Sequence, residues 1–158
     1  MEEEIKTKIE KKKKSGLRVI LNLLVYVLIV GGIVFGLPKF LTWKLQTNYP
    51  MAAITSGSMW PVLKEGDLVF IEGVKDKSQI QVGDIIVFKN RVNNNLTIHR
   101  VVKMNEDDLV TKGDANFNED APTVYSDVIG KTFNLNEKPL RVPLLGSVTV
   151  FASSFRGE

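Results

Sequence analysis

The chain has 158 residues, a formal net charge of +3, 44% hydrophobic residues and 25% charged residues, and this composition is typical of a folded protein rather than a disordered one. The excess positive charge lies in residues 1–18, which hold seven Lys or Arg and four Glu, whereas residues 39–158 hold fourteen residues of each sign. A region without net charge has no basic field to attract a polyanion, so nucleic acid is not expected as a partner. The absence of cysteine excludes thiol catalysis, disulfides and thiolate metal sites.

An apolar segment follows the basic tail. Residues 19–37 carry no charge, and as a helix they would span roughly 28 Å, close to the thickness of a bilayer core. A cleavable signal peptide and a buried core helix are the alternatives, but a signal peptide has a shorter apolar region and a core helix shows a polar stripe. The sequence therefore predicts a transmembrane anchor over 19–38, a cytoplasmic tail over 1–18 and the rest of the chain outside, because positive charge favours the cytoplasmic side.

Residues 39–139 are predicted to form a small, mainly β domain, a barrel or a sandwich. Short apolar and β-branched runs are separated by Gly-Asp pairs and Asn-rich turns, which is the pattern of such domains. The expected strands are Leu68–Ile71, Ile85–Phe88, Leu96–Met104, Leu109–Lys112, Val128–Phe133 and Val148–Phe151. Residues 140–158 are apolar but interrupted by Pro143 and Gly146, so this C-terminal segment is expected either as a strand or as a membrane-associated segment.

Candidate catalytic residues begin with Ser58, in the sequence Thr-Ser-Gly-Ser-Met-Trp-Pro at 55–61. Serine needs a neighbouring base before it can act as a nucleophile, and Gly57 allows the backbone to approach a bound carbonyl. His99 is the only histidine of the chain and is therefore the candidate general base. A lone strand histidine is also compatible with simple packing, and an ordinary Ser-Gly-Ser loop is the alternative for Ser58. One imidazole without any thiol makes a metal site unexpected.

Carboxylates and amides gather in the stretch from Thr111 to Asp120, which contains Asp114, Glu119 and Asp120. Taken alone, the stretch is compatible with a polar turn or a weak calcium loop, although it lacks the complete spacing of the helical calcium loop. A carboxylate from it is also suited to hold the imidazole in the productive tautomer.

These motifs together resemble the type I signal peptidases, in the branch where histidine replaces the general-base lysine. The resemblance covers most of residues 20–135 and rests on five motifs in the family's order, preceded by an anchor: Ser56-Gly57-Ser58-Met59-x-Pro61, Gly66-Asp67, Gly83-Asp84-Ile-Ile-Val-Phe, His99-Arg100-Val101 and Lys112-Gly113-Asp114-x-Asn116. It implies that Ser58 is the nucleophile, His99 the general base and Ser56 an oxyanion-hole donor.

The resemblance also bears on the acid. It favours Asp120 as the third member of the triad and Asp114 as the organiser of the loop or the alternative acid, with Glu119 as a third candidate.

The function that this resemblance implies is that of a signal peptidase I: a membrane-bound serine endopeptidase that cuts preproteins after small residues, Ala-x-Ala-like, without a cofactor. Its partners would be preprotein signal peptides and membrane lipid, with accessory subunits left open. A bacterial plasma membrane is expected rather than the endoplasmic reticulum, because the chain is short and has no obvious accessory region. The alternative is a non-catalytic, membrane-anchored β domain that binds or assembles exported proteins.

Overall fold

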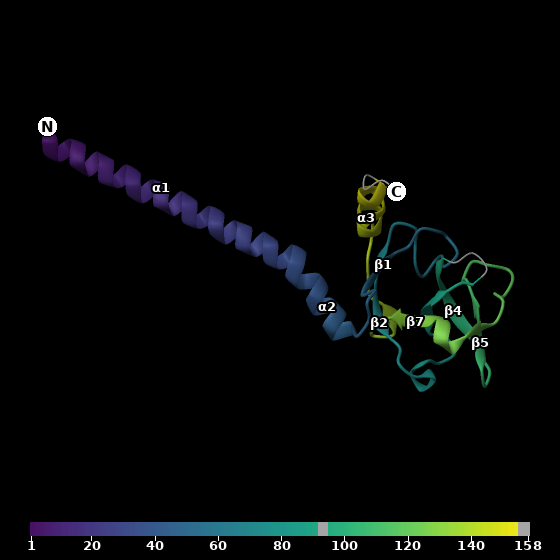
Figure 1. Ribbon diagram of the computed structural model, residues 1–158. Coiled ribbons are helices and arrows are strands. Elements are labelled where there is room, and N and C mark those ends of the chain that lie inside the picture. The colour runs from purple at the N-terminus through teal and green to yellow at the C-terminus, as the bar shows by residue number, and fades with distance from the viewer. Residues whose placement is uncertain (92–94, 155–158) are drawn as a thin grey trace. The chain divides into compact units, whose positions relative to one another are not determined.

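A computed structural model describes residues 1–91 and 95–154 of the chain (Figure 1). The chain divides into two compact units, Met1–Phe40 and Leu41–Glu158. The first unit is helical and the second contains the sheet, which matches the predicted fold class of a mainly β domain preceded by one apolar N-terminal helix.

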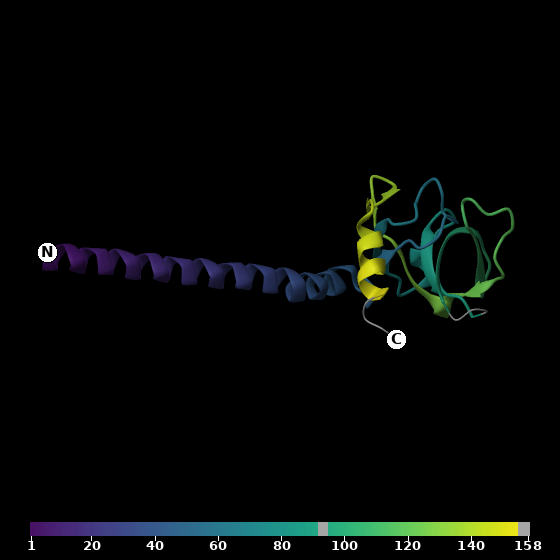
Figure 2. The same ribbon diagram turned by 90° about the horizontal axis from the view of Figure 1, so that it is seen from above.

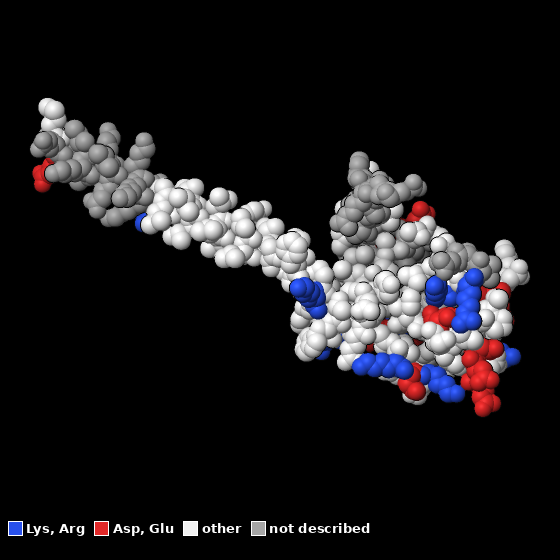
Figure 3. All heavy atoms as spheres, viewed as in Figure 1, with Lys and Arg blue, Asp and Glu red and all other residues white. Residues whose placement is uncertain are grey.

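The N-terminal helix is longer than the predicted anchor. Helix α1 spans Glu2–Gly31, a π-helical turn spans Gly32–Gly36, and helix α2 spans Leu37–Leu45, so the basic tail is helical as well. The most apolar 18-residue window of the stretch Gly16–Leu45 has a mean hydropathy of 2.6, and none of this window is buried, which separates the helix from the core helix of a soluble protein. Figure 3 shows a surface without charged residues along the middle of this stretch, between basic side chains near its two ends. The helix is long and apolar enough to cross a membrane.

Among the described residues, eight strands form one antiparallel sheet with the order β1-β2-β7-β3-β4-β5-β6, and β10 also pairs with β2. In Figure 2 the curled part of this sheet is seen end-on. The strand bounds are β1 Met51–Ala53, β2 Leu68–Gly73, β3 Ile85–Lys89, β4 Leu96–Met104, β5 Asp108–Lys112, β6 Thr123–Val124, β7 Val128–Thr132 and β10 Arg141–Val142. A separate hairpin joins β8, Asn134–Leu135, to β9, Lys138–Pro139. Two 3-10 turns complete the unit, η2 at Lys77–Gln79 and η3 at Tyr125–Asp127.

Strand β3 lies between two hydrophobic cores. Successive side chains of a strand point to opposite faces, and here Ile85 and Val87 enter one cluster while Ile86 and Phe88 enter the other. All four side chains are buried. This explains why the strand reads as a continuous apolar run rather than an alternating one. The first cluster also contains Ile54, Met59, Leu63, Val69 and Ile71, and the second contains Ile80, Val101, Leu109 and Val128.

The two Gly-Asp pairs form matching turns. Gly66 and Gly83 have φ angles of +87° and +100°, a region that favours glycine. Each following aspartate accepts a hydrogen bond from the amide three residues earlier: Lys64 to Asp67 at 2.9 Å, and Gln81 to Asp84 at 3.0 Å.

Each turn is also held by a cation from late in the chain. Arg141 Nη1 lies 2.6 Å from Asp67 Oδ2, and Lys131 Nζ lies 3.2 Å from Asp84 Oδ2. The turns therefore fix the starts of β2 and β3 against the C-terminal half of the domain.

The C-terminal segment differs from its predicted structure. The expected strand Val148–Phe151 is wrong, because these residues belong to helix α3, Leu145–Ser154. Gly146 packs directly on the first Gly-Asp turn, where an added Cβ would lie 2.3 Å from the Asp67 carbonyl oxygen. Ser147 N donates to Gly66 O at 3.3 Å. These tertiary contacts favour a helix that the β-branched residues alone do not indicate. Contact of this segment with a membrane stays a prediction.

The buried ion pair at the first turn yields a stability prediction. Asp67 is only 2% exposed, so Asp67→Asn leaves the Arg141 guanidinium without its counter-charge. We expect the free energy of unfolding to fall by about 1–3 kcal/mol, the range for a hydrogen bond to a charged group. Chemical denaturation of the full chain in detergent measures it. Asp107→Asn is the matched control because Asp107 is exposed, and it should change stability by no more than about 0.5 kcal/mol. Equal effects of the two changes would contradict the structural role of the pair.

Candidate active site

Ser58 lies on the loop that connects β1 to β2. Its neighbour Met59 is 1% exposed and belongs to the first core cluster, so the core fixes the backbone next to the serine. Turn hydrogen bonds hold the segment on its C-terminal side, from Trp60 N to Gly57 O at 3.1 Å and from Leu63 N to Met59 O at 2.9 Å. The Ser58 hydroxyl is therefore carried on a constrained loop rather than on a free one.

His99 lies on β4, directly opposite Ile86 of β3 in the antiparallel register. His99 is 7% exposed and shares its strand face with Val101 of the second core. Strand β4 pairs with β3 at His99 and with β5 from the next residue, Arg100, onward, so the sheet fixes the backbone around the histidine.

Asp120 comes from the loop between β5 and β6 and contacts the other side of the imidazole. Its amide donates to the Thr111 carbonyl at 2.8 Å, and its Oδ2 accepts from the Thr111 hydroxyl at 2.6 Å. Thr111 is fully buried on β5. A side chain and a main-chain group of one strand residue thus orient the Asp120 carboxylate.

The three side chains form one hydrogen-bonded line. His99 Nε2 lies 3.1 Å from Ser58 Oγ, and His99 Nδ1 lies 2.5 Å from Asp120 Oδ2. A carboxylate only accepts, so Nδ1 donates to Asp120, which leaves Nε2 of a neutral imidazole to accept from the Ser58 hydroxyl. This tautomer is the one in which the imidazole is able to remove a proton from serine.

Asp114 has a different partner. Its two carboxylate oxygens accept from Arg100 Nε at 2.8 Å and from Arg100 Nη2 at 2.7 Å, and Arg100 Nη1 donates to Gly83 O at 2.7 Å. Hydrogen bonding to Asp114 raises the pKa of the Arg100 guanidinium above its ordinary value. The structure thus brings Asp120 to His99 and brings Asp114 to Arg100. Glu119, the third candidate acid, is exposed.

Ser56 and a small cavity lie beside Ser58. The Ser56 hydroxyl is 3.2 Å from the Ser58 hydroxyl, within reach of an atom bonded to Ser58 Oγ. The cavity has a volume of about 150 Å³ and lies between the end of β1 and the start of β4. It is lined by Ala53, Ile54, Thr55, Ser56, Ser58, Met59, Leu96, Thr97, Ile98 and His99. Its size suits a small side chain.

The acid loop is joined to the serine loop by a close backbone contact at Gly113. Ala115 N donates to Ser58 O at 2.8 Å. A Cβ on Gly113 would lie 2.7 Å from the same Ser58 carbonyl oxygen and 2.7 Å from Asn116 Nδ2. Only glycine permits this approach without a shift of either loop.

Three supporting residues had no role assigned from the sequence: Thr111, Arg100 and Gly113. Arg100 and Gly113 lie inside two of the motifs, and Thr111 begins the carboxylate-rich stretch, but their contacts could not be predicted. Arg100 pairs with Asp114, fourteen residues away, and Gly113 packs against the Ser58 carbonyl on another loop. A local sequence pattern gives no information about such contacts. No cluster of three or more metal-ligating side chains occurs within residues 1–91 and 95–154.

A serine, a histidine and a carboxylate linked in this order are the arrangement of the serine hydrolases. Residues 34–120 match the family model described as Peptidase S24-like, which is more than half of the chain and includes all six candidate residues. The chain belongs to this family of peptidases and, within it, to the histidine-containing, endoplasmic-reticulum-type branch of the type I signal peptidases.

Three relatives support the assignment to this branch of the type I signal peptidases. The chain is 30% identical over 133 residues to the signal peptidase complex catalytic subunit SEC11 of Colletotrichum graminicola, which covers 73% of this chain and 74% of the relative. It is 30% identical over 131 residues to the sec11 subunit of Neurospora crassa, covering 72% and 73%. It is 29% identical over 119 residues to SEC11C of Homo sapiens, covering 67% and 58%.

These relatives correct one expectation. The prediction of a bacterial plasma membrane is wrong, because the matching proteins are fungal and mammalian catalytic subunits of a signal peptidase complex. That prediction rested on the length of the chain and on the lack of an accessory region. Neither property carries physical information about which membrane a helix enters.

The contact at Gly113 yields a prediction with an internal control. Gly113→Ala places a Cβ against the Ser58 carbonyl, and we expect it to lower the free energy of unfolding by about 1–3 kcal/mol, as overpacking does. Gly57→Ala makes the same chemical change on the serine loop, where a Cβ meets no atom within 4 Å, and should leave stability nearly unchanged. Denaturant titration of both variants compares them. A larger effect at Gly57 would contradict the described contact of the two loops.

Proposed function

We propose that this peptidase is a membrane-anchored serine endopeptidase that removes signal peptides from preproteins, with Ser58 as nucleophile and His99 as general base. The observation that carries the proposal is the line from Ser58 through His99 to Asp120, with contacts of 3.1 Å and 2.5 Å. The names of the relatives, catalytic subunits of a signal peptidase complex, support the substrate class.

The reaction begins when a substrate carbonyl lies against Ser58. His99 Nε2 takes the hydroxyl proton while Ser58 Oγ attacks the carbonyl carbon, and Asp120 stabilises the imidazolium that forms. The proton then passes from Nε2 to the leaving amine, the peptide bond breaks and an acyl-enzyme remains. A water molecule then gives a proton to the same nitrogen as its oxygen attacks the ester carbonyl carbon. The bond between that carbon and Ser58 Oγ breaks, His99 returns the proton to Ser58 Oγ, and the cleaved peptide leaves with a new carboxyl end.

The negative charge on the substrate oxygen needs donors. The proposed donors are the Ser58 amide and the Ser56 hydroxyl. The distance of 3.2 Å between the Ser56 and Ser58 hydroxyl oxygens supports the role of Ser56. Each such donor lowers the barrier by about 3–4 kcal/mol.

The cavity beside Ser58, with a volume of about 150 Å³, is the candidate site for the residue at the cut. An alanine-sized side chain fits in it, in agreement with the small residues that the proposal names. The apolar helix supports the membrane part of the proposal, because it confines enzyme and inserted signal peptide to one surface. The non-catalytic binding domain remains the alternative, and the 3.1 Å contact between Ser58 and His99 disfavours it.

Substitution of the nucleophile tests the proposal directly. We expect Ser58→Ala to abolish cleavage of a model preprotein by the full-length protein in detergent, with its melting temperature kept, because no other group takes the place of the hydroxyl oxygen. Mass spectrometry of the products measures the cut. Ser126→Ala is the control, since Ser126 is exposed on η3, and it should cleave at the wild-type rate. Cleavage by Ser58→Ala at the wild-type rate would contradict the assignment, and tight preprotein binding without any cleavage by the wild type would favour the binding domain.

A separate experiment tests whether Asp120 or Asp114 is the acid of the triad. Asp120→Asn places an amide against His99 Nδ1 and favours the wrong tautomer, so we expect kcat to fall by about 10³–10⁴-fold with little change in melting temperature. Asp114→Asn weakens the pair with Arg100, so stability should fall while far more of kcat is retained. Steady-state kinetics and thermal melts of both variants decide the roles. The reverse ranking of kcat would transfer the acid role to Asp114.

A further inference from the structure

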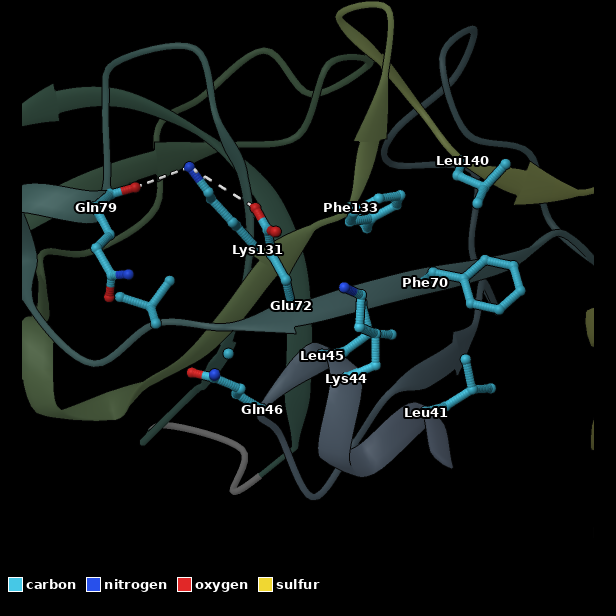
Figure 4. A pocket seen from close by; sticks show the side chains of 12 residues that line it. Leu41, Lys44, Leu45, Gln46, Phe70, Glu72, Gln79, Lys131, Phe133 and Leu140 are labelled. Carbon is cyan, nitrogen blue, oxygen red and sulfur yellow. Dashed lines mark hydrogen bonds and ion pairs between the residues drawn. The ribbon is translucent and has the colours of Figure 1, made fainter. Parts of the chain in front are cut away.

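A large cavity that carries no role in catalysis lies within the second unit, next to the end of helix α2 (Figure 4). Its volume is about 640 Å³, within the range of about 300–1,000 Å³ typical of small-molecule sites. Helix α2, strand β2 and the segment from β7 to Leu140 supply its walls. None of its lining residues lines the cavity beside Ser58.

One end of this cavity is apolar and belongs to neither hydrophobic core. Phe70, Phe133, Leu140 and Leu41 are half-buried, and none of them is a member of the two core clusters. Figure 4 shows these side chains gathered at one end of the cavity. Large apolar side chains that line a cavity instead of a core offer apolar surface to a ligand.

The other end of the cavity is polar, and its lysine is paired with neighbouring polar and acidic groups. Lys131 Nζ donates to Gln79 O at 2.8 Å, lies 3.2 Å from Asp84 Oδ2 and 4.0 Å from Glu72 Oε1. The charge of Lys131 is therefore already compensated by two carboxylates.

Lys44 is different. It is exposed on the last turn of α2, and within the part of the chain that the structure describes its ammonium group has no hydrogen bond or ion pair. An uncompensated cation at the mouth of an apolar cavity favours a ligand with an anionic head and an apolar tail.

The sequence places Lys44 within reach of the lipid headgroups. The uncharged segment ends near residue 38, and Lys44 follows six residues later in the same helix, a rise of about 9 Å along the helix axis. The headgroup layer on each side of a bilayer core is about 5–8 Å thick, and lysine side chains near the ends of spanning helices extend toward it. Trp43 and Tyr49, on either side of Lys44 in the sequence, are exposed aromatic residues of the kind enriched at that level.

We propose that this cavity binds one acyl chain of an anionic phospholipid, with the phosphate at Lys44 and the chain against Phe70, Phe133 and Leu140. The inference rests on the membrane anchoring stated under the proposed function. It adds a lipid site that is separate from the site of peptide cleavage, and it ties the β domain to the membrane at a second point besides the helix.

Photolabelling tests the site. The full-length protein is reconstituted into phosphatidylcholine vesicles that contain an equal, small fraction of either phosphatidylglycerol or phosphatidylcholine bearing a diazirine on the acyl chain, and labelled peptides are mapped by mass spectrometry. We expect labels on the peptides that contain Leu41, Phe70 and Phe133, with a yield about fivefold higher for the anionic probe, the effect of one lysine near an anionic lipid.

Two lysines of the same stretch give a matched pair. Lys44→Gln should lower the yield of the anionic probe about fivefold, whereas Lys39→Gln, which removes the same charge from a residue outside the cavity, should not. Leu140→Trp, which fills the apolar end, should lower labelling by both probes. Thermal melts of the variants exclude unfolding as the cause.

Several results would overturn the lipid site. Labels confined to residues 19–38 would mean that the protein meets only the lipids around its helix. Equal effects of Lys39→Gln and Lys44→Gln would mean general attraction to an anionic surface.

Flotation with the vesicles and preprotein cleavage are measured in parallel. A protein that floats and cleaves preprotein but carries no label in the cavity refutes the lipid site alone and leaves the proposed function intact. Labelling without cleavage refutes only the protease.

Discussion

The hydrogen bond from the Ala115 amide to the Ser58 carbonyl joins the two loops on which the candidate site depends. The serine loop is also held by Met59 and Leu63 in the first core. The acid loop is also held by the contact of Asp120 with Thr111 on β5 and by the pair of Asp114 with Arg100 on β4. Both loops also contact His99 on β4, through Ser58 and through Asp120. The hydrogen bond between the loops therefore completes a ring of contacts formed by the serine loop, the acid loop and β4 around the imidazole. Glycine at position 113 is a condition for that closure, since any Cβ there would occupy the space of the Ser58 carbonyl.

Adjacent side chains of strand β4 point to opposite faces of the sheet, so His99 and Arg100 have different partners. His99 points to the face where Ser58 and Asp120 lie, and Arg100 points to the opposite face, where it pairs with Asp114 and the carbonyl of Gly83. Arg100 thus connects the acid loop to the second Gly-Asp turn, which Lys131 holds from β7. A one-residue slip of β4 would exchange the two side chains and remove the base from the site. Register is therefore specified on both faces of the strand, by the cores and by this polar pair.

Much of the sheet could be predicted because its strands are locally encoded. Strand β4 has the predicted bounds, and β2, β3 and β5 differ from theirs by one or two residues at an end. Dense β-branched runs between Gly-Asp turns leave few other structures open. Helix α3 was missed because its apolar, β-branched residues favour a strand locally, while the contact of Gly146 with the first Gly-Asp turn favours the helix. Local pattern carries no information about that contact.

In the candidate site, too, the residue types could be predicted from the sequence, whereas the contacts between the residues could not. Ser58 and His99 were selected because each motif limits the choice of nucleophile and base, and their roles stay predictions that the geometry supports. The acid was harder to choose, since Asp114, Glu119 and Asp120 are chemically similar and lie within seven residues of one another. What separates the two aspartates is a pairing across the fold: Arg100 occupies both oxygens of Asp114, so the carboxylate left to face the imidazole is that of Asp120. A cation that commits one of two neighbouring carboxylates therefore determines the other one's part in the site.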